Sequence, residues 1–599
     1  MASRVGWRTR WMPARYNSVR LNVHVPMVTN DERGAVKSSE KMEAVSSDDA
    51  SQATVTNARA SLSVALGWNT GGLAIQAVFQ LTFGLLLARI LGPTTYGLMA
   101  MAWITLTPAI ILADAGLGLA LVQKQGLAVS TIRYSFCIQS VLAFFVGIFL
   151  CMLAPRIAEF FVAPDLAEVL IVGSSILLVQ AFGQIPVNLL RRRLDFRRLQ
   201  LVQLLALVGS TLLVSLPLAL AGFGIWSLVA GALANVATIS IGAGVLTPAE
   251  TGIPRRTLSI LVAVAVAVPA LPVFFGVSFW TISATIAING ALVATAIYHA
   301  GQGRSLQEFW RHGGYASASL RFLLLNLINA AAGALPALII GRFFGVATLG
   351  LYDRASALIV APVDRAAASV SNVLFSHHAD LHRTGMTQTN LFLRSLSMAF
   401  LAGIPFAVGV VENGSLIVDV ALGAKWLGVV PLVAPLAALA VLVLALQAAV
   451  PVLNGRGRPE VDLVTQLASI VLFLIAVAFV AHDETTNILW ALVAAYGFRV
   501  LCLLIALGYL LAIRLRSLLI SIVPGGFTAI LALAANRILS EKLPSSISEP
   551  ARLAAMIAIY ALMLLLAWFA YRTFFCARLF GGSHGRAADD ALGGSFKDR

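Results

Sequence analysis

The chain has 599 residues, of which 59% are hydrophobic and 12% are charged, and its mean hydropathy is +0.88. Soluble globular proteins carry about 25% charged residues, so most of this protein's surface does not face water. The composition excludes a cytosolic enzyme, a nucleic-acid-binding domain and a disulfide-stapled secreted protein, and it predicts a polytopic membrane protein. We attribute the net charge of +15 to basic cytoplasmic loops, and we expect no nucleic-acid partner.

Both ends of the chain are polar. Residues 1–60 lack helical periodicity and contain five arginines and no acid in their first 30 positions, which predicts a disordered basic cytoplasmic arm. A membrane-surface segment, a transit peptide and an upstream start codon followed by Met27 or Met42 are the alternatives. Residues 578–599 are polar and rich in glycine, which predicts a disordered cytoplasmic tail.

A bilayer span takes roughly 20 apolar residues, and the segments of this length form two sets of six and a final pair. The first set predicts an N-lobe over residues 61–247, with spans near 63–88, 97–121, 134–154, 166–190, 199–220 and 223–247. The second predicts a C-lobe over residues 318–513, with spans near 319–341, 350–375, 390–411, 428–452, 462–481 and 487–512. The pair predicts two C-terminal helices over residues 514–577, near 517–536 and 552–574.

Between the two lobes lies a further apolar stretch, 257–299, which is too long for one span. Its residues Pro269, Pro272 and Gly276 predict two helices that turn near Gly276. We therefore expect an inserted helical hairpin and a cytoplasmic linker within residues 248–317.

The placement of Lys and Arg tests this topology, because cytoplasmic loops carry an excess of both. With a cytoplasmic N-terminus, the inner loops and adjoining helix ends hold 18 of these residues and the outer ones hold 8. Omitting one span would invert every later loop and remove the difference. The pattern predicts that both termini are cytoplasmic and that the inserted segment crosses the membrane an even number of times.

The two sets of six spans carry a repeated motif. LLARILGPTTYGLMAMA (86–102) aligns with IIGRFFGVATLGLYDRA (339–355) at an offset of 253, and the matched positions are Arg89, Gly92, Thr95 and Gly97 with Arg342, Gly345, Thr348 and Gly350. A second match, at an offset of 265, closes the fourth span of each set and joins Pro186, Arg191 and Arg193 to Pro451, Arg456 and Arg458. Six spans per repeat is an even number, so the repeats run in parallel and predict a transporter with its site between two lobes.

These segments resemble a known family when they are taken together in chain order. The stretches are RILGPTTYG (89–97), DAGLGLALVQ (114–123), RRRLDFRRL (191–199), FGIWSLVAG (223–231), IIGRFFGVATLGLYDRA (339–355), LGAKW (422–426) and NGRGRPE (454–460). They are similar to Wzx-type oligosaccharide flippases of the MOP exporter superfamily, over roughly residues 60–515. The resemblance implies an all-α, V-shaped, MOP/MATE-like transporter that exports polyprenyl-pyrophosphate-linked oligosaccharides by alternating access. The hairpin at 257–299 and the absence of a proline after Phe375 depart from that pattern.

Charges within spans are rare, and each one suggests a function. Arg365 and Arg499 lie near the middle of their spans, and a guanidinium group presents a planar fork suited to phosphate oxygens. We predict that both bind the pyrophosphate, with internal salt bridges, such as Arg365 with Asp114, as the alternative. Arg89 and Arg342 end the first helix of each lobe, where interfacial snorkelling competes with a paired gate or a headgroup contact.

Two aspartates, Asp114 and Asp364, are predicted to be buried acids. A carboxylate at such depth could couple transport to H⁺ or Na⁺, and serving as a structural partner for arginine is the alternative. No other cofactor is expected. Amide side chains at helical spacing could line the pathway and bind sugar hydroxyls, or they could join helices to one another. These are Asn69, Gln76, Gln80, Gln180, Gln184, Asn326 and Asn329.

Other motifs receive plainer interpretations. His377, His378 and His382 are predicted to lie in a solvated cytoplasmic loop, without flanking metal ligands. The arginines between Arg191 and Arg198 are most simply a topology signal, with binding of anionic lipid headgroups as a secondary use. The four cysteines are isolated in or beside apolar segments and show neither metal-ligand nor disulfide spacing.

The sequence thus predicts a multi-pass protein of a bacterial inner membrane that is not an enzyme. It would flip a polyprenyl-pyrophosphate-linked oligosaccharide during surface polysaccharide assembly, with the lipid bilayer and other assembly proteins as further partners. A drug or cation antiporter of the same fold is one alternative. A membrane-embedded polymerase or acyltransferase is another, although the longest outer loop has about 16 residues, too few for a catalytic domain.

Overall fold

The computed structural model describes residues 67–68, 71–118, 121, 129–247, 255–267, 279–301, 313–480, 484–542 and 548–571. Four predictions fall outside these ranges: the N-terminal arm 1–60, the tail 578–599, the turn near Gly276 and the side chain of Asn69. Within the described ranges the regular structure is helical, without a strand.

The first repeat contains six predicted spans, and each has a helix. They are Gly71–Ile90, α2 (Pro93–Asp114), α4 (Val129–Phe161), α5 (Asp165–Arg192), α6 (Phe196–Gly209) with its continuations η1 (Ser210–Ser215) and α7 (Leu216–Leu220), and α8 (Ile225–Leu246). Pro93 opens α2, where its missing N–H costs nothing. The helix ends at Asp114 because Ala115 and Gly116 adopt positive φ angles of 50° and 70°.

The second repeat begins with a 71-residue helix, α14 (Gly313–Arg383), that is broken at Gly345, where φ is 82° and ψ is −177°. This break divides α14 into the first and second spans of the repeat. The helices that follow are α15 (Thr389–Glu412), α16 (Gly414–Ala421), the 3₁₀ segment η2 (Ala424–Val429), α17 (Val430–Gly455), α18 (Pro459–Val480) and α19 (Thr485–Leu510). After them come α20 (Leu515–Lys542) and α21 (Glu549–Ala570).

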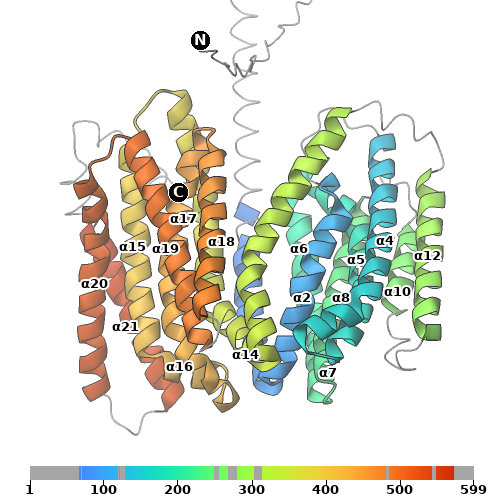
Figure 1. Cartoon of the computed structure of the whole chain (residues 1–599), viewed down its shortest axis with the longest axis horizontal. Helices are drawn as coiled ribbons and strands as arrows, with labels where there is room; N and C mark the ends of the chain where they lie inside the picture. The colour runs from blue at the N-terminus through green and yellow to red at the C-terminus, as the bar shows by residue number, and fades with distance from the viewer. Residues whose placement is uncertain are drawn as a thin grey trace, which may run out of the picture. The chain divides into compact units, whose positions relative to one another are not determined.

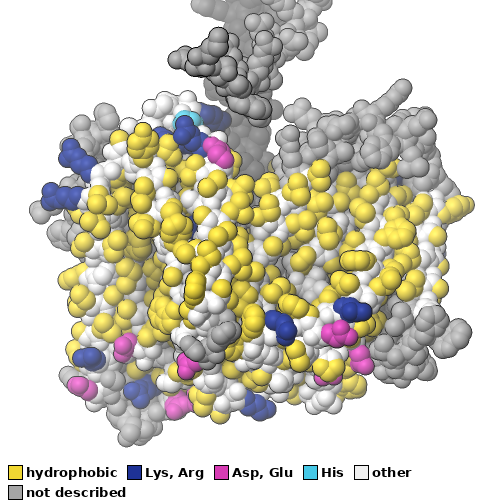
Figure 2. All heavy atoms as spheres, in the orientation of Figure 1, with side chains coloured by type: hydrophobic (Ala, Val, Ile, Leu, Met, Phe, Trp, Pro, Cys, Tyr) yellow, Lys and Arg dark blue, Asp and Glu magenta, His cyan; other side chains and the backbone are white. Residues whose placement is uncertain are grey.

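Thirteen of the described helices are long and apolar enough to cross a membrane. Since α14 supplies two spans, all fourteen spans predicted outside the insert have a helix. The protein is therefore a multi-pass membrane protein. Figure 2 shows hydrophobic side chains covering the middle of the visible face, with most Lys, Arg, Asp and Glu towards its two ends. Phe479, 84% exposed, and Leu213, 78% exposed, are among the large apolar side chains on the surface.

In each repeat one central helix organises the packing. α5, the most deeply buried of the spans, packs against α2, α4 and α8, and α17 packs against α14, α15 and α19. Figure 1 shows the helices of the two repeats as two groups, with α14 beside α2. The two C-terminal helices join the second group, where both pack against α15.

The inserted segment forms two helices, α10 (Arg255–Ala267) and α12 (Phe279–Gly301). α10 packs against α8 and α5, and α12 packs against α4, so the insert lies against the first repeat (Figure 1). The described residues of α10 extend about 20 Å at 1.5 Å each.

The prediction of a solvated loop at His377, His378 and His382 is wrong as to the loop, because all three lie in a helix; His377 and His382 are exposed, but His378 is not. α14 continues as a helix to Arg383, and the His378 side chain is 0% exposed. Its backbone carbonyl accepts a hydrogen bond of 2.7 Å from the side chain of Gln388. The helix persists because this turn packs against Gly455 at the end of α17, where an added Cβ would lie 2.9 Å from the backbone of Ala379.

Candidate functional site

The two copies of the repeated motif meet one another. A Cβ added to Gly97 would lie 1.8 Å from the carbonyl oxygen of Val346, and one added to Gly350 would lie 1.9 Å from the carbonyl oxygen of Pro93. Each glycine therefore faces the backbone of the other repeat, where α2 runs beside α14 (Figure 1). Small residues allow such close approach of helices within membranes, so the motif forms a reciprocal contact between the lobes.

Arg89 and Arg342 also join the two repeats. The guanidinium of Arg89 donates to the last carbonyls of α16, at 3.2 Å to Ala421 and 3.4 Å to Asp419, and it contacts the carbonyl of Val420. A cation suits this position because the carbonyls at a helix C-terminus are unpaired and carry partial negative charge. The guanidinium of Arg342 lies 5.4 Å from the centre of the Phe160 ring at the end of α4.

Trp426 closes the same region from the second repeat. Its side chain is 0% exposed, and its Nε1 donates a 2.9 Å hydrogen bond to the carbonyl of Ala88. It also makes an edge contact with Tyr96, over whose ring Arg354 lies at 4.2 Å. The sequence showed Trp426 only as part of LGAKW and gave it no role. We call the region formed by Arg89, Gly97, Arg342, Gly350 and Trp426 the closed end; the predicted topology puts it on the outer side.

A polar cavity lies away from the closed end, among α2, α4, α5 and the start of α14. Its volume is about 200 Å³. Its polar lining combines four residues predicted from the sequence with three that were not predicted as site residues. The predicted ones are Asp114, Gln180, Gln184 and Asn326, and the others are Gln139, Asn188 and Arg191. Sequence reasoning missed Gln139 because it is a single amide in an apolar helix, and it interpreted Arg191 as a topology signal. Asn188 did have a signal, since it continues the four-residue spacing of Gln180 and Gln184 in α5.

Asp114 is held at the end of α2 by three donors. They are the backbone N–H groups of Gly116 and Gly118 and the side chain of Gln139, whose Nε2 lies 2.9 Å from the carboxylate. These bonds explain the DAGLG sequence, because the turn that brings the N–H groups to the carboxylate needs the positive φ of Gly116. The alternative pairing of Asp114 with Arg365 is not observed.

Arg365 and Asp364 point to different partners, as their adjacent positions on a helix require. The Nη1 of Arg365 donates to Gln80 in the first repeat at 2.8 Å, and Asp364 accepts from Gln447 in α17 at 3.1 Å. The prediction that Asp364 is buried is wrong: the side chains of both Asp364 and Arg365 are exposed. Since the Arg365–Gln80 bond joins the two repeats, Arg365 lies where the lobes face one another.

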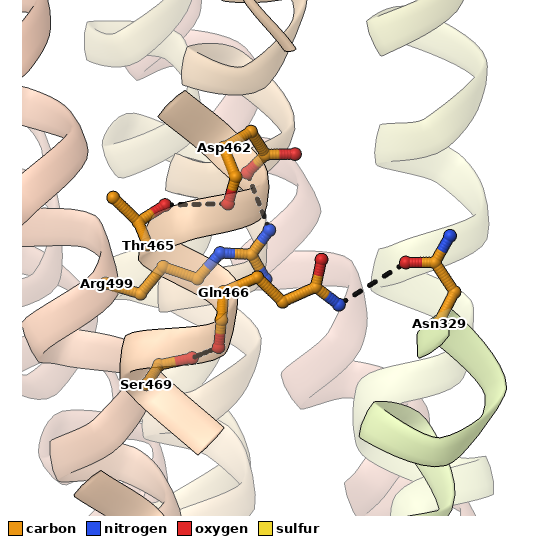
Figure 3. A network of polar contacts seen from close by, with 6 residues as sticks. All are labelled: Asn329, Asp462, Thr465, Gln466, Ser469 and Arg499. Carbon is orange, nitrogen blue, oxygen red and sulfur yellow. Dashed lines mark hydrogen bonds and ion pairs between the residues drawn. The ribbon is translucent and has the colours of Figure 1, made fainter. Parts of the chain in front are cut away.

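Arg499 is paired within the second repeat. Its Nη2 lies 2.7 Å from Asp462, and the two side chains are 13% and 19% exposed (Figure 3). This is the salt-bridging alternative to phosphate binding, and neutralisation by Asp462 weakens the case for Arg499 as a free cationic ligand.

Gln76 and Asn329 occupy equivalent positions, at the offset of 253 that relates the repeats. Gln76 donates to Gln200 at 2.8 Å, and Asn329 accepts from Gln466 at 3.4 Å (Figure 3). In each repeat the bond joins the first span to the fifth. Both amides therefore serve the interhelical use that competes with sugar binding.

Comparison with known proteins identifies the family. The model of a family described as polysaccharide biosynthesis protein matches residues 86–255 and 250–431, more than half of the chain. The chain belongs to this family. Among related sequences, the teichuronic acid biosynthesis protein TuaB of Bacillus subtilis (strain 168) is 27% identical over 186 residues, 31% of this chain and 37% of TuaB. The succinoglycan biosynthesis transport protein ExoT of Rhizobium meliloti (strain 1021) is 31% identical over 169 residues, 28% of this chain and 33% of ExoT.

The matches span about a third of the length of these two relatives. Among solved structures, the lipid II flippase MurJ in an inward closed conformation aligns with a TM-score of 0.56 and 13% identity, covering 84% of this chain and 99% of MurJ. The chain therefore has a fold like that of MurJ, and the predictions of family resemblance and of fold class are confirmed.

Proposed function

We propose that the protein flips a polyprenyl-pyrophosphate-linked oligosaccharide across the bacterial inner membrane during surface polysaccharide assembly. The single observation that carries the proposal is the polar cavity of about 200 Å³ within a bundle of apolar helices. The polysaccharide biosynthesis family and the flippase fold support it.

The chemistry of such a lipid explains the need for this arrangement. Its polyprenyl tail can stay among lipid tails, but its diphosphate and glycan cannot cross bare hydrocarbon without a large desolvation cost. Arg365 is exposed and donates a hydrogen bond to the neutral Gln80, which leaves its charge available for a diphosphate. The amides Gln180, Gln184 and Asn326 offer donors and acceptors to sugar hydroxyls.

Alternating access would then proceed by separation of the closed end. The contacts between the repeats there are two close glycine–backbone approaches, an arginine on a helix end, an arginine over an aromatic ring and one tryptophan hydrogen bond. These contacts adjoin a hydrophobic core that both repeats share, with Met101 and Phe161 from the first and Leu349 from the second, so opening would also expose apolar side chains. We propose that it opens outward with the termini in the cytoplasm, and that Asp114 or Asp364 couples the cycle to H⁺ or Na⁺.

The rival functions are less well supported. A drug or cation antiporter of this fold would favour a mainly acidic and aromatic cavity, whereas the cavity here contains five amides, one acid and one arginine. For a polymerase or acyltransferase, the outer loops offer no room for a catalytic domain. We infer a transporter without enzymatic activity that acts alongside the other assembly proteins.

Deletion of the gene in the native host tests the proposal. We expect polyprenyl-linked repeat units to accumulate on the cytoplasmic leaflet and surface polysaccharide to fall, with both restored by the intact gene. Unchanged polysaccharide without accumulation of the lipid intermediate would refute the flippase function. Accumulation of unpolymerised units on the outer leaflet would instead indicate a polymerase.

A further inference from the structure

Two polar atoms in the wall of the cavity have no hydrogen-bond partner. They are the Oε1 of Gln139, an acceptor, and the Nδ2 of Asn188, a donor. Each residue is only 2% exposed, and both line the same cavity. Buried amide groups are normally hydrogen-bonded, so each exception calls for an explanation, such as a ligand or ordered water.

Both amides are held in place by their other atoms. The Nε2 of Gln139 donates to Asp114 at 2.9 Å, and the Oδ1 of Asn188 accepts from Arg191 at 3.4 Å. Gly118 makes room for Asn188, because a Cβ at position 118 would clash with its Nδ2. The two amides are therefore held close to the cavity, and because their free atoms are almost fully buried, a small rotation of each side chain would present them to a ligand.

The charges around the cavity favour an uncharged ligand. Asp114 and Arg191 lie in the same lining and oppose one another in charge. A bare anion would meet the carboxylate of Asp114 and the oxygen of Gln139. A bare cation would meet the guanidinium of Arg191 and the NH₂ of Asn188. A neutral group that both donates and accepts satisfies both free atoms.

The size of the cavity points to a single sugar ring. The cavity volume of about 200 Å³ is many times the roughly 10–15 Å³ that one ordered water needs. That space suits a six-membered ring with its substituents. Hydroxyl and N-acetyl groups supply both a donor and an acceptor, and three further amides, Gln180, Gln184 and Asn326, extend the lining.

We propose that this cavity is a subsite for one uncharged pyranose of the glycan, recognised by the Oε1 of Gln139 and the Nδ2 of Asn188. The proposal rests on the proposed function and deepens it by separating two tasks. The cavity, lined mainly by the first repeat, selects a neutral sugar, and Arg365, on the second repeat, attracts the diphosphate.

Saturation-transfer NMR on the full-length protein in detergent tests the subsite. The probes are the methyl glycosides of glucose, N-acetylglucosamine and glucuronic acid. We expect a saturable signal from at least one of the two neutral glycosides, at least fivefold stronger than that of the glucuronide. Equal signals from all three, or none with the wild-type protein, would overturn the proposal; the second result means that water alone fills the cavity.

Matched variants locate the binding. Gln139→Leu and Asn188→Leu should each abolish the signal, and Gly118→Ala should weaken it by displacing Asn188. Asn235→Leu is the control, because Asn235 is an amide of the same repeat that bonds Ser210 in η1 and does not line the cavity. Thermal melting verifies that each variant is folded. Signals that persist in folded Gln139→Leu and Asn188→Leu would refute the assignment.

The same variants separate this proposal from the flippase function. If the deletion strain accumulates lipid-linked units but both cavity variants restore export fully and bind glycosides as the wild type does, the flippase function stands and the subsite is refuted. If deletion causes no accumulation, the flippase function is refuted, and the glycoside signals of the purified protein still decide whether the cavity binds a sugar.

Discussion

Adding one methyl group at the closed end should open it. In Gly97→Ala the new Cβ would lie 1.8 Å from the carbonyl oxygen of Val346, and in Gly350→Ala it would lie 1.9 Å from that of Pro93. Real Cβ atoms essentially never approach closer than 3.0 Å, so α2 and α14 must separate by more than 1 Å. Overpacking of this kind costs about 1–3 kcal/mol. If only the closed state bears that cost, its population relative to the open state falls by about 5- to 150-fold.

Labelling of a buried cysteine at the closed end measures this shift. The labelling site is Leu349→Cys, in a background without the native cysteines. Leu349 lies next to Gly350, and its native side chain is 0% exposed. A membrane-impermeant maleimide should label it faster when Gly97→Ala or Gly350→Ala is present. Gly92→Ala is the matched control, because Gly92 belongs to the same motif but has no atom within 4 Å of an added Cβ. Equal labelling rates in all three variants and the parent would refute this reasoning.

Three further substitutions test the polar contacts. Trp426→Phe removes the hydrogen bond to Ala88 and should lower stability by about 1 kcal/mol, seen as a lower Tm of the detergent-purified protein; an unchanged Tm would contradict the bond. Arg365→Gln should reduce export about tenfold or more at normal membrane abundance, because a charged hydrogen bond contributes about 1.5–3 kcal/mol; normal surface polysaccharide would show that Arg365 is structural. Asp462→Asn leaves the largely buried Arg499 without a counter-charge and should lower stability by about 3–5 kcal/mol. The double variant Asp462→Leu with Arg499→Leu should recover much of that stability. Equal membrane abundance of the wild type and Asp462→Asn would contradict this.

Much of the fold could be predicted from hydropathy and charge. The break at Gly345 had a sequence signal, since Gly345 matches Gly92 across the repeats and both begin the second span. The loop predicted at His378 failed for a specific reason: polarity suggested solvent, but packing against Gly455 keeps this turn helical and buried. The prediction for Asp364 failed in the opposite direction: it was expected to be buried, and its side chain is exposed. Its position in the middle of a span gave no information on which side of the helix faces its neighbours.

The sequence predicted several residues of the candidate site but not which residues contact one another. Asp114, Gln180, Gln184 and Asn326 do line one cavity, and the helical spacing of Gln180 and Gln184 had suggested that these two share a face. Gln139 was not predicted because a lone amide in an apolar helix is equally typical of helix packing.

The sequence by itself determined the number of spans and the parallel repeat. Both are local properties: in lipid each span must satisfy its own backbone hydrogen bonds, so its length and apolar character define it without reference to neighbours. Only the tertiary structure decided what each polar side chain contacts. Arg365 bonds Gln80, 285 positions away, and Arg499 bonds Asp462, 37 positions away. Such pairs depend on the rotation and tilt of whole helices, which the packing of many side chains sets together.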